Sequence, residues 1–514
     1  MIVETRYESR SYSSDLLLGA AGHSSPAEAQ SSGAFTAVPS MGTGRSAHTA
    51  TLLLDGRVLI VGGESGSAQR PLFTTEIYDP ATQTFTPSGN MTTARSRHTA
   101  TLLPDGRVLI VGGDTAGSAE LYDPSTGSFT ATGSLLIPRK GFNATLLNDG
   151  KVLITGGVSR STQFGDVIGD AEVFDPATGM FTAAGDYAGT LANLAITTFG
   201  FASTSTLLPN GTVLFATEPS AQVFDPVRGA FSLSDAMLVH WPWGGWFAPD
   251  YIAGRTANLL LNGKVLMAGG EQEDTGRYTD AELYDSASGV FVPTGSMIRA
   301  RDGHTATLLP DGTVLMAGGE SQRCDAEHCY FSGTESTAEL YDPVKGGFAS
   351  AGNMIAPREW HSATLLNSGE VLITGGIAYG GIGMYYGETG SAELYRPASV
   401  SSPPTLFSIF QNGQGQGAIW HATTGEIASA VHPAVAGEIL SMYTSGLAES
   451  GVIPPQVSIG SALGEIVYFG DAPGYPGYYQ VNFRVPAGVS PGTAIPVRLT
   501  YLGRPSNEVS MAIQ

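Results

Sequence analysis

The segment HTATLLPDGRVLIVGG at residues 98–113, followed by AELYDP at residues 119–124, decides the fold because it recurs along the chain. Each copy has a hydrophobic hairpin with a tight turn, a pair of small residues and an acidic-aromatic strand. A fixed period of about 52 residues is typical of radial or stacked β architectures. The turn glycines of the seven copies are Gly56, Gly106, Gly150, Gly211, Gly263, Gly312 and Gly369.

One repeat contains four short strands. Residues 99–103 and 107–111 are aliphatic and β-branched, and Asp105-Gly106 between them is a strong hairpin-turn signal. Residues 120–124 alternate and end at a proline, and a fourth strand begins near Phe129. Four antiparallel strands without a helical pattern between units predict the blade of a β-propeller.

The phenylalanines predict how the ring closes. Fourth-strand phenylalanines follow the first six units, but the seventh unit ends near Tyr395 without one. An extra copy of this strand, around Phe35, stands before the first unit. We therefore expect the N-terminal strand to complete the last blade and remove its open edge. The predicted fold is all-β, with a poorly ordered segment at 1–32, a seven-bladed propeller at 33–400 and a second domain at 401–514.

These repeats resemble the kelch family over roughly residues 34–397. The resemblance implies a β-propeller, and it leaves function open, since kelch propellers serve as enzymes, protein-binding modules and sugar-handling proteins. Unit four departs from the pattern, with Ala216-Thr217 at the place of the glycine pair. The glycine pairs are Gly62-Gly63, Gly112-Gly113, Gly156-Gly157, Gly269-Gly270, Gly318-Gly319 and Gly375-Gly376.

The C-terminal residues 401–514 lose the period and alternate in short strands separated by Gly-Pro turns, which predicts a small β-sandwich. This part resembles an immunoglobulin-like domain common on large secreted bacterial repeat proteins. The resemblance implies an extracellular or cell-surface protein, although residues 16–21 are too short for a secretory apolar core. Cys324 and Cys329 form a local disulfide if the protein is exported, or remain two free thiols.

The net charge of −21 argues against a nucleic-acid partner, because phosphate binding needs clustered lysines and arginines. No apolar stretch is long enough for a membrane span. We expect a monomer that binds a carbohydrate or a protein ligand.

An Arg-x-x-His motif precedes the first strand of several repeats, and it has two interpretations. The histidines His48, His98, His304 and His361 form a ring that binds a metal or an anion, or the motif has a structural role within each blade. The structural interpretation is favoured, because a residue repeated in most blades usually serves the blade. In the structural interpretation, the arginines form ion pairs with glutamates that also recur in the repeats. These glutamates are Glu76, Glu120, Glu172, Glu282, Glu339 and Glu393.

Aromatic residues in loops that break the repeat predict a ligand site at the central opening, since flat aromatic faces suit sugar rings. The alternative is that the loop between units four and five folds inward as a plug or packs on the C-terminal domain. The predicted ligand-binding residues are His240, Trp241, Trp243, Trp246, Tyr251, Arg358, Trp360, His361, Tyr379, Tyr385 and Tyr386.

The combination of a kelch propeller and an immunoglobulin-like domain is also similar to galactose oxidase and its copper-radical relatives. That family uses a Tyr-His pair in its last blade, and here Trp360 precedes His361. No catalytic residues and no cofactor are predicted, with copper or another metal as the less favoured case. The function predicted is a secreted binding protein. The alternatives are an oxidase-like or sugar-modifying enzyme on the same face and a structural or protein-interaction scaffold.

Overall fold

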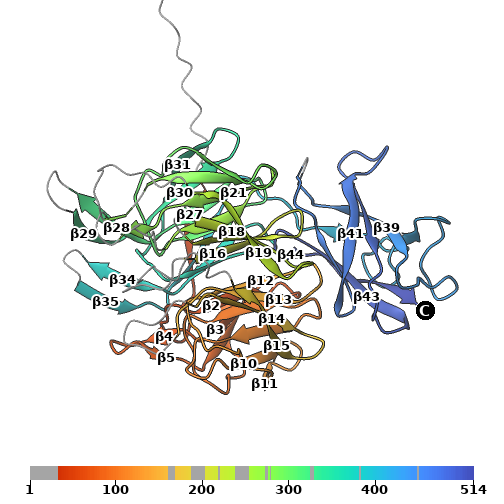
Figure 1. The fold of residues 1–514 in the computed structure, drawn as a ribbon, viewed down its shortest axis with the longest axis horizontal. Coiled ribbons are helices and arrows are strands. Elements are labelled where there is room, and N and C mark those ends of the chain that lie inside the picture. Colours follow the sequence, from red (N-terminus) through yellow and green to blue (C-terminus); the bar gives the residue numbers. More distant parts are fainter. Residues whose placement is uncertain are drawn as a thin grey trace, which may run out of the picture.

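The computed structural model describes residues 33–159, 168–186, 203–217, 220–237, 254–272, 276–277, 279–324, 329–380, 384–448 and 451–514. All regular elements in these residues are β-strands, and they form a ring of seven four-stranded antiparallel sheets followed by a separate C-terminal sheet (Figure 1). The predicted all-β fold and the seven-bladed propeller are therefore confirmed. Among these residues, none belongs to a helix that is long and apolar enough to cross a membrane.

Each blade uses four strands in the order in which they occur along the chain. Blade one contains β2 (Thr49–Leu52), β3 (Val58–Val61), β6 (Thr75–Asp79) and β7 (Thr84–Pro87). Blade two contains β8 (Thr99–Leu102), β9 (Val108–Val111), β10 (Ala119–Asp123) and β11 (Ser128–Ala131). Blade three contains β12 (Asn143–Leu146), β13 (Val152–Thr155), β14 (Asp170–Asp175) and β15 (Met180–Asp186).

Blades four to six repeat this order. Blade four contains β16 (Ser203–Leu207), β17 (Val213–Thr217), β18 (Ser220–Asp225) and β19 (Ala230–Ala236). Blade five contains β20 (Thr256–Leu259), β21 (Lys264–Ala268), β24 (Ala281–Asp285) and β25 (Val290–Pro293). Blade six contains β26 (Thr305–Leu308), β27 (Val314–Ala317), β30 (Thr337–Asp342) and β31 (Gly347–Asn353).

Blade seven joins the two ends of the propeller. It contains β32 (Ser362–Leu365), β33 (Val371–Thr374), β36 (Ala392–Arg396) and, as its outer strand, β1 (Ala34–Val38). The antiparallel register places Phe35 opposite Tyr395, with ring centroids 4.9 Å apart. This is the N-terminal closure that the unpaired seventh repeat predicts.

The hydrophobic core of the propeller lies between neighbouring blades. The first strands of successive blades contact one another around the ring, and the contact of β2 with β32 closes it. The second strands, such as β3 and β9, are fully buried aliphatic runs. In every blade an aromatic residue of the third strand packs on the fourth-strand phenylalanine, as Tyr122 does on Phe129 at 4.9 Å. Aliphatic and aromatic burial between blades thus supplies the main driving force of the ring.

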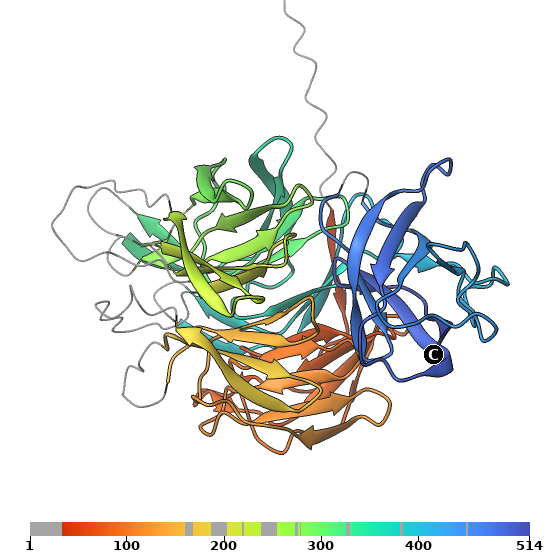
Figure 2. The same cartoon turned by 45° about the vertical axis from the view of Figure 1, so that its right-hand side comes forward.

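Four short hairpins extend from the ends of second strands on one face of the ring. Three of them lie on the side away from the C-terminal domain in both views (Figures 1 and 2). They consist of β4 (Glu64–Ser65) with β5 (Arg70–Pro71), β28 (Glu320–Cys324) with β29 (Cys329–Thr334), and β34 (Ile377–Gly380) with β35 (Met384–Glu388). The fourth consists of β22 (Glu271–Gln272) with β23 (Gly276–Arg277).

The C-terminal residues form a curled nine-stranded sheet around a core of their own, which includes Met442, Phe483 and Leu499. This sandwich-like sheet fits the predicted β-sandwich, and its immunoglobulin-like character stays a prediction. Its strands are β37 (Thr405–Leu406), β38 (Ile419–His421), β39 (Ile439–Ser445), β40 (Gln456–Ile459), β41 (Ala462–Asp471), β42 (Tyr479–Arg484), β43 (Gly492–Tyr501), β44 (Arg504–Pro505) and β45 (Val509–Ile513).

The C-terminal domain contacts the face of the ring opposite to the four short hairpins. This face carries the tight turns between the first and second strands of the blades, such as those at Leu54 and Pro104. A cavity between the two parts is lined by Ala50, Ala100 and Ala363 of three first strands and by Gln456 and Leu502 of the C-terminal sheet. The backbone N–H of Val452 also donates to the carbonyl of Leu261 at 2.9 Å. The opposite end of the central opening, on the hairpin face, is therefore the end that the C-terminal domain leaves uncovered.

Candidate functional site

A chain of backbone hydrogen bonds runs around the hairpin end of the central opening. It joins the residue before the histidine position in blades six, seven, one, two and three. The backbone N–H of Trp360 donates to the carbonyl of Gly303, and the N–H of Ala47 donates to the carbonyl of Trp360. In the same way the N–H of Arg97 donates to the carbonyl of Ala47, and the N–H of Gly141 donates to the carbonyl of Arg97. The four distances are 2.8–3.2 Å. All five residues have φ between 49° and 64°. We call this chain the rim; it places one side-chain position per blade at the opening.

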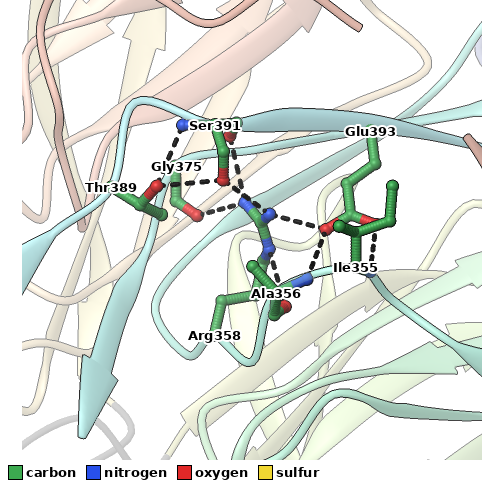
Figure 3. A network of polar contacts seen from close by, with 7 residues as sticks. All are labelled: Ile355, Ala356, Arg358, Gly375, Thr389, Ser391 and Glu393. Atoms are coloured by element: carbon green, nitrogen blue, oxygen red, sulfur yellow. Dashed lines mark hydrogen bonds and ion pairs between the residues drawn. The ribbon is translucent and has the colours of Figure 1, made fainter. Parts of the chain in front are cut away.

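The arginines at the first position of the Arg-x-x-His motif each hold their own blade together in five of the seven blades. Arg358 is fully buried; its guanidinium donates to the carbonyls of Gly375 and Ser391 and forms an ion pair with Glu393 at 2.6 Å (Figure 3). The other oxygen of Glu393 accepts the N–H of Ile355 in the loop before the first strand. The same pairing is found for Arg45–Glu76, Arg95–Glu120, Arg139–Glu172 and Arg301–Glu339. In blade five Arg255, which stands at the histidine position, forms the ion pair with Glu282.

The structural interpretation of the arginines is thus confirmed by geometry. Each carboxylate neutralises a buried guanidinium and accepts hydrogen bonds, which a buried charge requires. Because Arg358 has no exposed surface and its donors are used inside blade seven, the predicted contact between Arg358 and a ligand is not available to it.

The four histidines lie one at each of four blade interfaces and do not converge on one point. The Nε2 atom of His98 is 3.0 Å from the hydroxyl of Thr49, and His304 and His361 contact Thr256 and Thr305 of the preceding blades in the same way. His48 contacts Thr374 of blade seven across the closing interface. These placements favour a structural role between blades over a shared metal site.

Burial also lowers the basicity of these imidazoles. It lowers the pKa of His48 to about 3, with the positive charges of Arg45 and Arg358 adding to the effect. The pKa of His304 falls to about 3 for the same reasons, with Arg301 as the charged neighbour. The imidazoles are therefore neutral in the folded protein at physiological pH. In blade three Phe142 replaces the histidine, and the buried hydroxyl of Thr99 then has no hydrogen-bond partner in the described structure.

The rim carries two large side chains, Trp360 and Arg97. The Arg97 guanidinium carbon lies 5.7 Å from the centroid of the Trp360 ring, so it reaches across the small Ala47 of the intervening blade. Arg97 also contacts the carboxylate of Glu64 at 3.4 Å. Both side chains are partly exposed. Together they present an aromatic and a cationic group at the opening.

Three carboxylates cluster next to the rim residues Gly303 and Trp360. Asp302, Glu320 and Glu359 each offer an oxygen atom, and these atoms lie within 4.8 Å of one another. Burial raises the pKa of the Tyr379 phenol, and the negative charges of Glu359 and Glu320 add to this effect. Tyr379 of β34 therefore belongs to the same acidic surrounding, which suits the hydroxyl groups of a polar ligand.

The remaining predicted site residues cannot be placed. His240, Trp241, Trp243, Trp246 and Tyr251 lie outside the described residues. For Tyr385 and Tyr386 the structure gives the backbone of β35 alone. Their part in ligand binding stays a prediction.

The backbone places the two cysteines of the predicted disulfide next to each other. Cys324 and Cys329 stand opposite each other in the antiparallel register of β28 and β29. The disulfide itself stays a prediction.

Sequence reasoning missed the rim arginine Arg97 and the acidic residues near Trp360. A signal for the latter was present in the repeats. Asp302 and Glu359 directly follow the repeated arginine, where blades one and two have Ser46 and Ser96. Glu320 directly follows a glycine pair. Glutamate also follows the glycine pair at Glu64 and Glu271, so a comparison of equivalent positions would have found Asp302 and Glu359 but not Glu320.

The comparisons with known proteins agree with this fold. A family model of the kelch motif matches residues 45–92, which form most of the first repeat. A search of curated proteins found no match. Among solved structures, a fungal alcohol oxidase of the AA5 family in complex with copper is similar to the chain, with 15% identity and a TM-score of 0.63. That similarity covers 94% of this chain and 99% of the oxidase. YjhT also matches, at 16% identity and a TM-score of 0.41 over 69% of this chain and 95% of that protein.

The molecule is thus a seven-bladed β-propeller that carries a kelch motif at residues 45–92 and is similar in fold to an AA5 alcohol oxidase. The similarity raises the question whether this chain fits copper. Copper sites in proteins favour imidazole and sulfur donors, whereas carboxylates suit magnesium, calcium or manganese. Here the carboxylates of Asp302, Glu320 and Glu359 lie beside the rim. His361 bonds to Thr305 at a blade interface, and Trp360 precedes it in place of a tyrosine. The described donor set does not fit a copper-radical centre.

Proposed function

We propose that this protein binds a polyhydroxylated ligand, a carbohydrate, at the hairpin end of its propeller opening, and that it does so outside the cell. Trp360 supplies a flat face for a sugar ring, Arg97 supplies hydrogen-bond donors, and the partly exposed Glu320 accepts hydrogen bonds from hydroxyl groups. The opposed register of the two cysteines supports the extracellular setting, since disulfides persist in oxidising compartments.

The observation that carries this proposal is the backbone conformation of the rim. Trp360 and Arg97 have φ values of 52° and 55°, which cost an L-residue roughly 1–2 kcal/mol each. Gly141 and Gly303 adopt the same conformation without this cost. Closing the ring requires no large side chain at these positions, since Gly141, Gly303 and the small Ala47 make the same rim bonds. Strain of this kind at a large aromatic residue is typical of binding sites.

The test compares Trp360→Gly with Ala47→Gly, because both variants keep a rim residue that tolerates positive φ. We expect Trp360→Gly to lose about tenfold or more in affinity on a glycan array and in calorimetry with the glycans that bind. Ala47→Gly should bind like the wild type. Trp360→Gly should also gain up to about 1 kcal/mol in unfolding free energy, because the strain is relieved.

Two results would contradict the proposal. Undiminished glycan binding by Trp360→Gly would remove the rim as the site. Metal analysis that found one tightly held copper per chain, lost in His361→Ala, would favour the oxidase-like alternative instead.

A further inference from the structure

The outer face of the C-terminal sheet carries aromatic and amide side chains side by side. Along β39 and β42, residues alternate between buried and partly exposed, so every second side chain faces outward. The register places Trp420 of β38 opposite Ser441, and Ser441 opposite Asn482 of β42. In the next row Tyr443 stands opposite Gln480. These five residues, together with Tyr475 beside Tyr443, define what we call the outer face.

The aromatic groups of the outer face form a connected row. The rings of Trp420 and Tyr443 meet edge to face at 5.5 Å, and Tyr475 lies 6.5 Å from Tyr443. Tyr475 is 64% exposed. An exposed aromatic side chain of this size gains no hydrophobic free energy in the free protein. It gains that free energy when a ligand covers the ring.

The segment that presents Tyr475 is rigid. Tyr475 lies in Pro473-Gly474-Tyr475-Pro476-Gly477, and its N–H donates to the carbonyl of Ala472 at 3.0 Å. The carbonyl of Tyr475 accepts the N–H of Tyr478 at 3.1 Å, which closes a second turn. Because prolines and two hydrogen-bonded turns fix this loop, a ligand that stacks on Tyr475 pays little ordering entropy.

The polar groups of the outer face are uncharged and oriented. Gln480 Nε2 donates to Asn482 Oδ1 at 2.9 Å, which fixes both amides. Each amide has a second polar atom, Oε1 of Gln480 and Nδ2 of Asn482, that suits a hydroxyl group. In a chain of net charge −21, a neutral face with amides, a serine and aromatic rings matches an uncharged, hydroxyl-rich ligand.

From this arrangement we infer that the outer face of the C-terminal sheet is a second carbohydrate site, which binds a neutral polysaccharide chain. The sugar rings stack on Tyr475 and Tyr443, and their hydroxyl groups bond to Gln480 and Asn482. The site is separate from the rim and holds whether or not the rim binds a ligand. Both sites together would make the protein bivalent for a polysaccharide surface.

The experiment measures binding of the full chain to neutral gluco-, xylo-, manno- and chito-oligosaccharides and to the corresponding insoluble polysaccharides. We expect Tyr475→Ala to weaken binding to the preferred polysaccharide about tenfold, and Tyr475→Phe, which keeps the ring, to bind within about twofold of the wild type. Trp360→Gly should leave this binding in place. Because Tyr475 lies at an exposed turn, equal melting temperatures check that all variants are folded.

Three results would overturn the inference. Polysaccharide binding that Tyr475→Ala and Tyr443→Ala both retain would exclude the outer face. Binding lost in Trp360→Gly but kept in Tyr475→Ala would place the ligand at the rim alone and leave the proposed function standing. A dimer by light scattering that Tyr475→Ala dissociates would show that a second copy of the chain, and not a glycan, covers this face.

Discussion

Each buried arginine of the propeller is neutralised by a single glutamate, and this pair also fastens the loop that leads to the rim. In blade two, Arg95 and Glu120 are both buried, with 2.8 Å between Nη2 and Oε1. Glu120 Oε2 accepts the N–H of Thr92 at 2.9 Å. Removing the negative charge leaves an uncompensated guanidinium in the blade, which is far more costly than losing a surface ion pair.

We therefore expect Glu120→Gln to lower the unfolding free energy by about 3 kcal/mol. The matched control is Asp55→Asn, which breaks the exposed ion pair of Asp55 with Arg57 and should cost less than about 1 kcal/mol. Urea unfolding of both variants and the wild type measures the difference. Equal transition midpoints for Glu120→Gln and the wild type would contradict the structural role of the pair.

The buried histidines predict how stability depends on pH. The pKa values of His48 and His304 are about 3 in the folded protein, against an ordinary value near 6.5. Between these values the unfolded chain binds a proton that the folded protein does not. The unfolding free energy should therefore be highest above pH 6.5 and fall as the pH drops toward 3, by up to about 1.4 kcal/mol per pH unit for each such histidine.

The histidine contribution can be isolated by unfolding at pH 6.5, 5.5 and 4.5. We expect His304→Asn to give a shallower decrease of stability with falling pH, because one proton-uptake site is gone. Thr256→Val removes the hydroxyl that His304 contacts at 3.1 Å but keeps the histidine. It should lower stability and retain the wild-type slope. Identical slopes for wild type and His304→Asn would show that His304 is not a source of the acid sensitivity.

At the scale of the element, the glycine pair follows the second strand in six of the seven blades and fixes the distance to the next blade. The N–H of Gly319 donates to the carbonyl of Arg358 in blade seven at 2.9 Å, and Gly113 makes the same bond to Arg139. A Cβ atom on Gly318 would clash with the carbonyl oxygen of Arg358 and lie 2.8 Å from His361 Cε1. The pair is therefore a contact between blades as well as a turn.

Two glycines of positive φ allow the backbone strain of a substitution to be separated from its clash with the next blade. Gly318 has φ +64° and no space for a Cβ atom, whereas Gly66 has φ +78° and no atom within 4 Å of such a Cβ. Both alanine variants carry the backbone strain of about 1 kcal/mol. We expect Gly318→Ala to cost about 2–3 kcal/mol more than Gly66→Ala, because the blades must move apart. Similar costs in thermal unfolding would argue against close packing at the pair.

The strands were predictable from sequence because each repeat carries its own turn and alternation signals. The pairing of Arg95 with Glu120 was predictable as well, since both recur in register. The rim was not, because Trp360 and Arg97 come from blades distant in sequence and meet only through the ring. Arg358 shows the converse, since it was predicted as a ligand contact and is buried inside blade seven, where its donors bind groups of the blade.

At the scale of the whole molecule, the ring is closed by contacts between its two ends. The strand β1 pairs along its length with β36, and Tyr395 beneath it is fully buried. The N–H of Gly376 in blade seven also donates to the carbonyl of Arg45 in blade one at 2.8 Å. Because the rim bonds of Ala47 and Trp360 cross this same interface, closure of the ring and geometry of the site depend on each other.

The closure can be tested with two chains that begin at residue 33 and at residue 39. The second lacks β1, so it loses the ladder to β36 and the contact of Phe35 with Tyr395. We expect its melting temperature to be about 10 °C lower, since several kcal/mol of packing and pairing are lost in a large protein. The exposed edge of β36 should also promote association at high concentration. A synthetic peptide of residues 33–40 should restore part of the lost stability, because it can add to the open edge as a strand. Equal melting temperatures of the two chains would show that the ring is held closed without its N-terminal strand.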